Sequence, residues 1–130
     1  MTALADNAKE AAEESRVLFR AGHYGGACSR AYFAMFNMAR ALLLEKGYRP
    51  EEAKTHKSVL RLFSMAFVKP GLFEAQNGRA LREAYDARQE ADYEGGISER
   101  DAATILASME HFLKIADVAL GDLNNSQEKS

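Results

Sequence analysis

Apolar residues recur at intervals of three and four along most of the chain, which is the spacing of amphipathic helices. Glycine and proline residues interrupt this pattern, and such residues commonly end helices or form turns. The chain has only two prolines and is rich in alanine, leucine, glutamate and arginine, a composition that favours helix. The pattern predicts five helical segments, at about 3–20, 27–47, 56–68, 73–93 and 99–123.

The connections between these segments are short, and short connections place consecutive helices side by side in opposite directions. We therefore predict an all-α fold, an up-and-down antiparallel bundle of four to five helices that spans residues 1–123. With 47% hydrophobic residues, a chain of this length can bury one core. The segment 124–130 is polar, and we expect it to be a disordered tail.

Apolar side chains nearly encircle the predicted helix at 27–47, where only Arg30, Asn37 and Arg40 form a polar stripe. A helix that is apolar around so much of its circumference is either central in the bundle or faces a partner subunit. If this helix faces a partner subunit, the candidate interface residues on it are Tyr32, Phe36 and Arg40.

The predicted helix at 73–93 carries an apolar stripe that ends in charged residues. Helical spacing places four of its residues on one face: Leu81, Tyr85, Arg88 and Asp92. Charges that continue a core-facing stripe are costly unless paired, and Arg88 and Asp92 are four residues apart and can pair. In the alternative interpretation, Arg88, Asp92 and the adjacent Tyr93 form an anion or nucleotide site, because a planar guanidinium binds phosphate well.

The predicted third helix begins directly after Thr55, and its first two residues are His56 and Lys57. Backbone amides at a helix N-terminus favour anions, so these residues are further candidates for an anion site, with Arg30 as a second arginine. In the alternative interpretation they belong to a helix cap and a solvated first turn. The three histidines lie at no metal-ligand spacing, and we expect neither a metal site nor a cofactor.

The net charge of −2 argues against a protein that coats nucleic acid, although it leaves room for a local basic patch. Cys28 is the only cysteine, which is typical of a reducing compartment, so we expect a cytoplasmic protein. No uncharged apolar run approaches the ~20 residues of a membrane-spanning helix, and we expect no membrane association.

Segments from three predicted helices together resemble the HEPN domain family. They are Ala27 to Phe36 (ACSRAYFAMF), Gly47, Thr55-His56-Lys57, and Arg88 to Tyr93 (RQEADY). The resemblance extends from about residue 11 to residue 120, and it rests on the order and spacing of these segments rather than on any single one.

This resemblance implies a small helical bundle that forms homodimers and acts with a minimal nucleotidyltransferase, often as toxin and antitoxin. Many HEPN domains are metal-independent RNases with an arginine followed, after four to six residues, by a histidine. Here Arg88 and the polar Gln89 match the start of that motif, but positions 93 to 95 hold Tyr93, Glu94 and Gly95. The ending Ala-Asp-Tyr resembles a variant branch of the family that lacks the histidine.

Three functional hypotheses follow. The first is a non-catalytic or weakly active nucleotide- or RNA-binding partner of a minimal nucleotidyltransferase. The second is a metal-independent RNase in which Arg88 stabilises the charge of the transition state and Asp92 or His56 transfers protons. The third is a purely structural dimerisation or interaction module in which Arg88 and Asp92 are a buried pair.

Overall fold

A computed structural model describes residues 3–91 and 96–129 of the chain. Its elements are α1 (Ala3–Arg20), α2 (Tyr24–Lys46), α3 (His56–Phe63), a π-helical turn η1 (Ser64–Val68), α4 (Ala75–Ala91) and α5 (Glu99–Lys129). Within these described ranges there is no β-strand, so the predicted all-α fold is confirmed.

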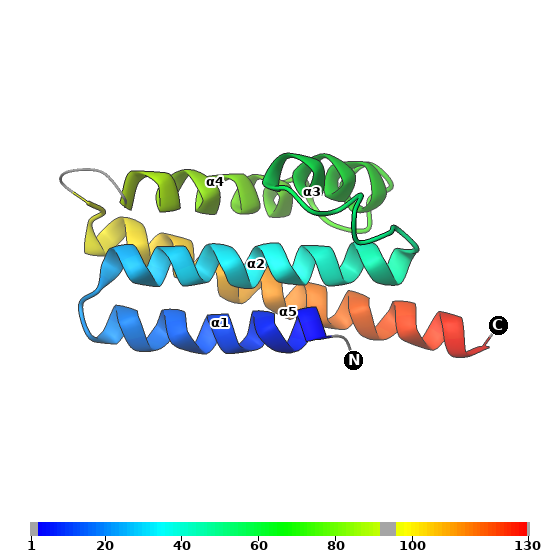
Figure 1. Cartoon of the computed structure of the whole chain (residues 1–130), viewed down its shortest axis with the longest axis horizontal. Coiled ribbons are helices and arrows are strands. Elements are labelled where there is room, and N and C mark those ends of the chain that lie inside the picture. Colours follow the sequence, from blue (N-terminus) through cyan, green and yellow to red (C-terminus); the bar gives the residue numbers. More distant parts are fainter. Residues whose placement is uncertain (1–2, 92–95, 130) are drawn as a thin grey trace.

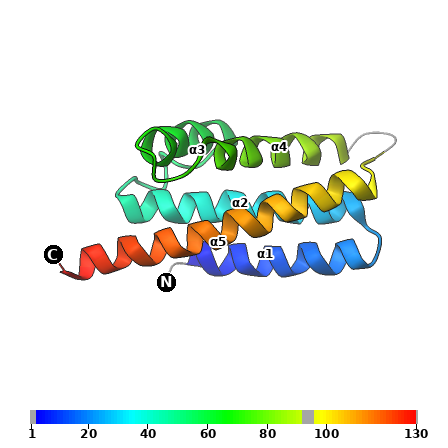
Figure 2. The same ribbon diagram turned by 180° about the vertical axis from the view of Figure 1, so that it is seen from behind.

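The four long helices alternate in direction, as expected of an up-and-down bundle (Figure 1). α1, α2 and α4 lie side by side, and α3 with η1 lies beside the first half of α4. α5 crosses behind this layer and packs against α2, which Figure 2 shows from the other side. The fold thus places α2 at the centre, in contact with α1, α3, α4 and α5.

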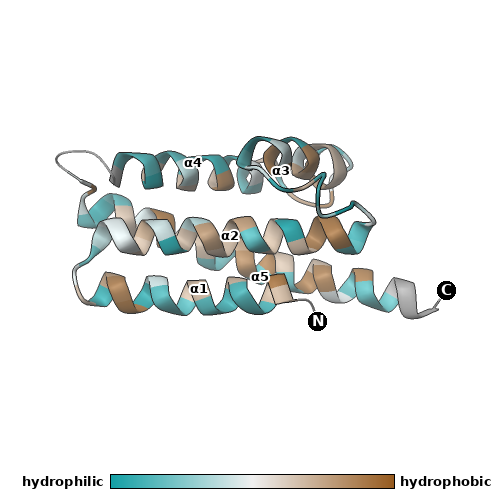
Figure 3. Cartoon of the chain, in the orientation of Figure 1, coloured by the Kyte–Doolittle hydropathy of each residue, from teal (hydrophilic) through white to brown (hydrophobic). Residues whose placement is uncertain are grey.

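The central position of α2 follows from its small buried residues. Several of its alanines are fully buried, among them Ala27, Ala31, Ala34 and Ala41, and they face neighbours that are also rich in alanine. Small side chains let helix backbones approach closely, which strengthens van der Waals contact along the whole interface. In Figure 3, α2 carries long hydrophobic stretches whereas the visible residues of α4 are mostly hydrophilic.

Local sequence signals fix several helix ends. Gly47 ends α2 in the left-handed conformation, with φ of +113°, which glycine adopts without steric cost. Thr55 and Ser58 form a reciprocal capping box at the start of α3, with the Thr55 hydroxyl accepting from the Ser58 amide at 3.1 Å. The Ser98 hydroxyl likewise accepts from the Asp101 amide at the start of α5.

Three helix limits differ from the sequence prediction. α2 begins at Tyr24 rather than at 27, because Gly25 and Gly26 adopt helical backbone angles instead of forming a turn. α4 begins at Ala75 rather than at 73, because Phe73 instead packs its ring edge-on against both Phe63 and Phe67 in an aromatic cluster of the core. α5 runs past 123 to Lys129, since this stretch contains no glycine or proline that would end a helix. The division of the chain into a bundle of 1–123 and a disordered tail stays a prediction.

Candidate functional site

Aromatic and basic side chains from α2, α3 and α4 meet around Tyr32. The ring of Tyr32 has four ring neighbours, whose centroids lie 5.5–5.8 Å away, and the Arg88 guanidinium lies 5.5 Å from its centroid. We call this group the Tyr32 cluster, and its members are Tyr32, Phe33, Phe36, His56, Tyr85 and Arg88. It joins candidate residues that the sequence places on three separate helices.

Tyr32 forms the buried centre of this cluster, with only 3% of its surface exposed. Burial raises the pKa of its phenol to about 12, an effect that the positive charge of Arg88 partly offsets. Tyr32 therefore keeps its proton at neutral pH. Since the ring is already covered within one chain, it has little surface left for the dimer interface predicted from the sequence, and that role stays a prediction.

His56 is held between two tyrosines. Its ring stacks on Tyr85 with centroids 3.7 Å apart and planes 11° apart, and its Nδ1 lies 3.4 Å from the Tyr32 hydroxyl. Burial lowers the pKa of His56, against an opposing effect from the Asp86 carboxylate. The imidazole is therefore neutral at neutral pH.

The tautomer of His56 decides what its other nitrogen can do. If Tyr32 donates to Nδ1, then Nε2 carries the proton and can donate to a phosphate oxygen. If Nδ1 donates to the Tyr32 oxygen, then Nε2 has a free lone pair and can accept a proton. The first arrangement suits ligand binding, and the second suits general base catalysis.

Two arginines lie against the ring of Phe33. The guanidinium carbon of Arg88 is 4.8 Å from the ring centroid and that of Arg30 is 4.7 Å away. Arg30 also forms an ion pair with Glu14 at 3.1 Å, whereas no carboxylate in the described ranges pairs with Arg88. Asp92 and Tyr93, the predicted partners of Arg88, lie outside the described residues, so the pair of Arg88 with Asp92 stays a prediction.

The remaining predicted residues lie at the edge of the cluster. Phe36 stacks on Tyr32 and is half-buried. Arg40 donates from Nε to the carbonyl oxygen of Ala53 at 2.6 Å, which ties the segment before α3 to α2. Lys57 is exposed. Phe36 and Arg40 stay predicted interface residues, and Lys57 stays a predicted anion ligand.

The sequence-based site omits Phe33 and Tyr85, which are central to the observed arrangement. Each aromatic residue lies three positions from an arginine of the site, Phe33 after Arg30 and Tyr85 before Arg88. Residues three apart are neighbours on a helix surface, so an aromatic residue at this spacing from an arginine was the available signal.

Comparison with known proteins identifies the family. A sequence model described as the HEPN domain matches residues 1–119. The chain belongs to the HEPN domain family.

Some relatives of this HEPN domain are named as toxins, and others have names that state no function. It is 34% identical to "Putative toxin MJ0605" of Methanocaldococcus jannaschii, over 93% of this chain and 89% of that protein. It is 36% identical to "Putative toxin MJ0142" of the same organism, over 72% of this chain and 62% of that protein. A "UPF0332 protein" of Archaeoglobus fulgidus is 32% identical, over 87% and 89% of the two chains.

Membership of the HEPN family gives meaning to the position of His56. No histidine follows Arg88 at the spacing of the family's RNase motif. The fold nevertheless places the imidazole of His56, from α3, against Tyr85, one turn before Arg88 on α4. This HEPN domain thus has an arginine and a histidine in one cluster, although they come from different helices.

Two absences hold for residues 3–91 and 96–129, the part of the chain that the structure describes. In these ranges no three or more histidine, cysteine, aspartate or glutamate side chains are grouped so that they could hold a metal ion. No helix in the same ranges is both long and apolar enough to cross a membrane.

Proposed function

We propose that this HEPN domain is a nucleotide- or RNA-binding partner of a minimal nucleotidyltransferase in a toxin–antitoxin-like pair. The observation that carries the proposal is the approach of Arg30 and Arg88 to one ring, Phe33, in the cluster whose centre, Tyr32, also contacts His56. The toxin-like names of two relatives support the placement of this domain in a toxin–antitoxin-like pair.

The arrangement supports recognition of a phosphate next to a base. The planar guanidinium of Arg88 offers a fork of N–H donors to phosphate oxygens, and it has no carboxylate partner in the described ranges that would compete. A neutral His56 with its proton on Nε2 adds a donor without adding charge. Half-buried Phe33 and the two guanidinium groups against its ring offer a surface on which a base can stack, since bases stack on arginine planes as well as on aromatic rings.

Binding of a fluorescently labelled, 5′-phosphorylated RNA of about ten nucleotides tests this proposal. Arg88→Ala is expected to weaken binding by about ten-fold or more, since a charge-assisted bidentate contact is lost. Arg20→Ala, which removes the same charge from an exposed position on α1, serves as the matched control. Equal affinities for Arg88→Ala and Arg20→Ala would contradict the assignment of the site.

The homodimer is part of the same proposal. α2 keeps a partly exposed face that includes Phe36 and Arg40. A dimer that used this face would bring two Tyr32 clusters close together. Sedimentation of the wild type as a dimer, and of Phe36→Asp as a folded monomer, is the expected result. A folded, monomeric wild type at micromolar concentration would contradict the dimer.

A second candidate function, a metal-independent RNase, is favoured by the contacts of His56. With Nδ1 donating to Tyr32, the free Nε2 could remove the proton from a 2′-hydroxyl while Arg88 stabilises the charge that develops on the phosphorus oxygens. RNA cleavage in EDTA that is lost in both Arg88→Ala and His56→Gln is the expected result for this function. Binding without cleavage would leave the first function alone.

A further inference from the structure

The hydroxyl of Tyr32 has a single hydrogen-bond partner within residues 3–91 and 96–129, which is Nδ1 of His56 at 3.4 Å. Tyr32 is almost wholly buried, so this hydroxyl has little access to solvent. A phenol has one proton to donate, whereas a neutral imidazole has one nitrogen that donates and one that accepts. The direction of this hydrogen bond therefore decides which nitrogen of His56 carries the proton.

Donation from the Tyr32 hydroxyl to Nδ1 of His56 satisfies both groups. If Nδ1 donated instead, the phenol proton would have no acceptor in the described part of the chain, and a buried donor without a partner is costly. The imidazole nitrogen is also the more basic of the two atoms, and the phenol is the more acidic of the two groups. Tyr32 is therefore the donor and Nδ1 the acceptor.

The positive charge of Arg88 favours the same direction. Its guanidinium carbon lies 5.5 Å from the centroid of the Tyr32 ring. Burial raises the pKa of the Tyr32 phenol, and the charge of Arg88 partly offsets this effect because it favours negative charge on the phenol oxygen. For the same reason, Arg88 makes the Tyr32 hydroxyl a stronger hydrogen-bond donor.

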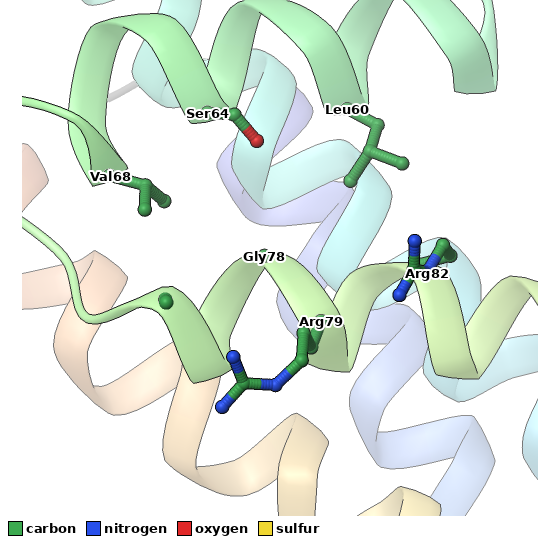
Figure 4. Close-up of a pocket in the computed structure, with 7 residues that line it drawn as sticks. Leu60, Ser64, Val68, Gly78, Arg79 and Arg82 are labelled. Carbon is green, nitrogen blue, oxygen red and sulfur yellow. The ribbon is translucent and has the colours of Figure 1, made fainter.

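A second tyrosine, Tyr85, fixes the plane of the imidazole. An open cavity of about 250 Å³ lies between α3 and α4, with Leu60 of α3 on one side and Arg82 of α4 on the other (Figure 4). One turn away on each helix, His56 stacks face to face on Tyr85 and so joins the two helices. Since Tyr85 holds the face of the ring and Tyr32 holds Nδ1, Nε2 lies on the edge that is directed away from the Tyr32 hydroxyl.

We propose that Tyr32 is a positioning residue, which donates to Nδ1 and thereby presents His56 to the ligand as a neutral hydrogen-bond donor at Nε2. The inference rests on the proposed function for the identity of the ligand, which is a nucleotide or RNA with an acceptor oxygen. His56 is half-buried, and Nε2 has no hydrogen-bond partner in the described ranges, so its N–H is left for such an oxygen. An RNase that used His56 as its general base would need the opposite tautomer.

A long-range ¹H–¹⁵N correlation spectrum of the full chain, recorded without RNA at pH 7.5, reads the two ring nitrogens of His56 directly. An unprotonated imidazole nitrogen resonates far downfield of a protonated one, and comparison with His56→Gln assigns the signals. Nε2 is expected at the protonated position and Nδ1 at the unprotonated position. An unprotonated Nε2 would overturn the proposal.

Two variants that each remove one phenol hydroxyl test the role of Tyr32 in this arrangement. Tyr32→Phe keeps the ring but removes the donor, so the Nδ1 signal of His56 should move further downfield. Tyr85→Phe keeps the stack and removes a hydroxyl that accepts from Gln89 at 3.3 Å, so the Nδ1 signal should keep its position. An Nδ1 signal that Tyr32→Phe leaves unchanged would also overturn the proposal. Circular dichroism of each variant verifies that it is folded.

Binding of the 5′-phosphorylated RNA tests the donor role of His56 itself. A glutamine amide can place an N–H near the position of Nε2 whereas leucine has no donor, so His56→Gln should bind about five-fold more tightly than His56→Leu. Equal affinities for these two variants, in a site that Arg88→Ala still weakens, would overturn the donor role. If Arg88→Ala has no effect on binding while the expected nitrogen signals are observed, the proposed function fails and the assignment of Tyr32 as the donor stands.

Discussion

His56 stacks face to face on Tyr85, with ring centroids 3.7 Å apart and planes inclined by 11°. Only the pairing of α3 with α4 brings these rings together, since the first residue of α3 meets the middle of α4. The contact holds an imidazole in the same cluster as Arg88, and both side chains lie against Tyr32. In this HEPN domain another residue occupies the motif position of the histidine.

The stability of the fold should fall as pH decreases below about 6.5, the ordinary pKa of histidine. Burial lowers the pKa of His56 in the folded state, so the unfolded chain binds the proton more readily. The contribution of His56 is therefore fully present above the unfolded pKa and is lost as pH falls through that value towards the folded pKa. Urea unfolding at pH 7.5, 6.5 and 5.5 measures the effect.

His56→Gln is the control for this titration. The variant should lose stability less steeply than the wild type over the same pH interval. If the two proteins show equal slopes, His56 is not the titrating group.

The close packing of α1 on α2 predicts a strong size limit at Ala8. This residue is fully buried, and α1 makes most of its contacts with α2. Ala8→Leu should lower the free energy of unfolding by about 1–3 kcal/mol, because the helices must separate to admit the larger side chain. Glu10→Leu adds a leucine at an exposed position of the same helix and should change stability by less than about 0.5 kcal/mol.

The ion pair of Arg16 with Glu110 links α1 to α5 and should contribute modestly to stability. Arg16 donates from Nε and Nη2 to the two carboxylate oxygens of Glu110, at 2.7 and 2.8 Å. Because both side chains are partly exposed, Glu110→Gln should cost no more than about 1 kcal/mol. Thermal unfolding at low and high salt measures this loss, which should shrink as salt increases.

The same pair predicts a dependence on acid pH. The hydrogen bond from Arg16 lowers the pKa of Glu110 below its ordinary value of 4.5. Its stabilising effect is therefore present above that value and is lost as pH falls through the lower pKa of the folded state. The stability difference between wild type and Glu110→Gln should be present at pH 7 and vanish near pH 2; a difference that persists there would contradict this cause.

Local signals in the sequence predict much of this fold correctly. Gly47, Thr55 and Ser98 mark helix ends by their own backbone and hydrogen-bonding chemistry, which needs no knowledge of the tertiary structure. The composition of α2 predicts that it is either central or faces a partner subunit, and within one chain it lies at the centre. Helix ends and the apolar faces of a helix depend on residues that are close in the sequence. The spacing of apolar residues along the chain therefore predicts them directly.

The site is predicted only in part, because it depends on contacts between helices. Periodicity places Arg88 at the end of an apolar stripe, but it does not show that the residue on the facing helix is Phe33. It also does not show that His56 stacks on Tyr85 rather than facing solvent at a helix N-terminus. Arg30, which the sequence offers only as a second arginine, reaches the same ring as Arg88.

The central claim, that the Tyr32 cluster binds a nucleotide or RNA, is tested most directly by NMR. The ¹H–¹⁵N spectrum of the labelled protein is recorded while a 5′-phosphorylated RNA oligonucleotide is added. The largest shifts are expected at the backbone amides of Phe33, His56 and Arg88 and at the imidazole of His56, and they should disappear in Arg88→Ala. Shifts that concentrate at residues outside the Tyr32 cluster, or a spectrum that excess RNA leaves unchanged, would contradict it.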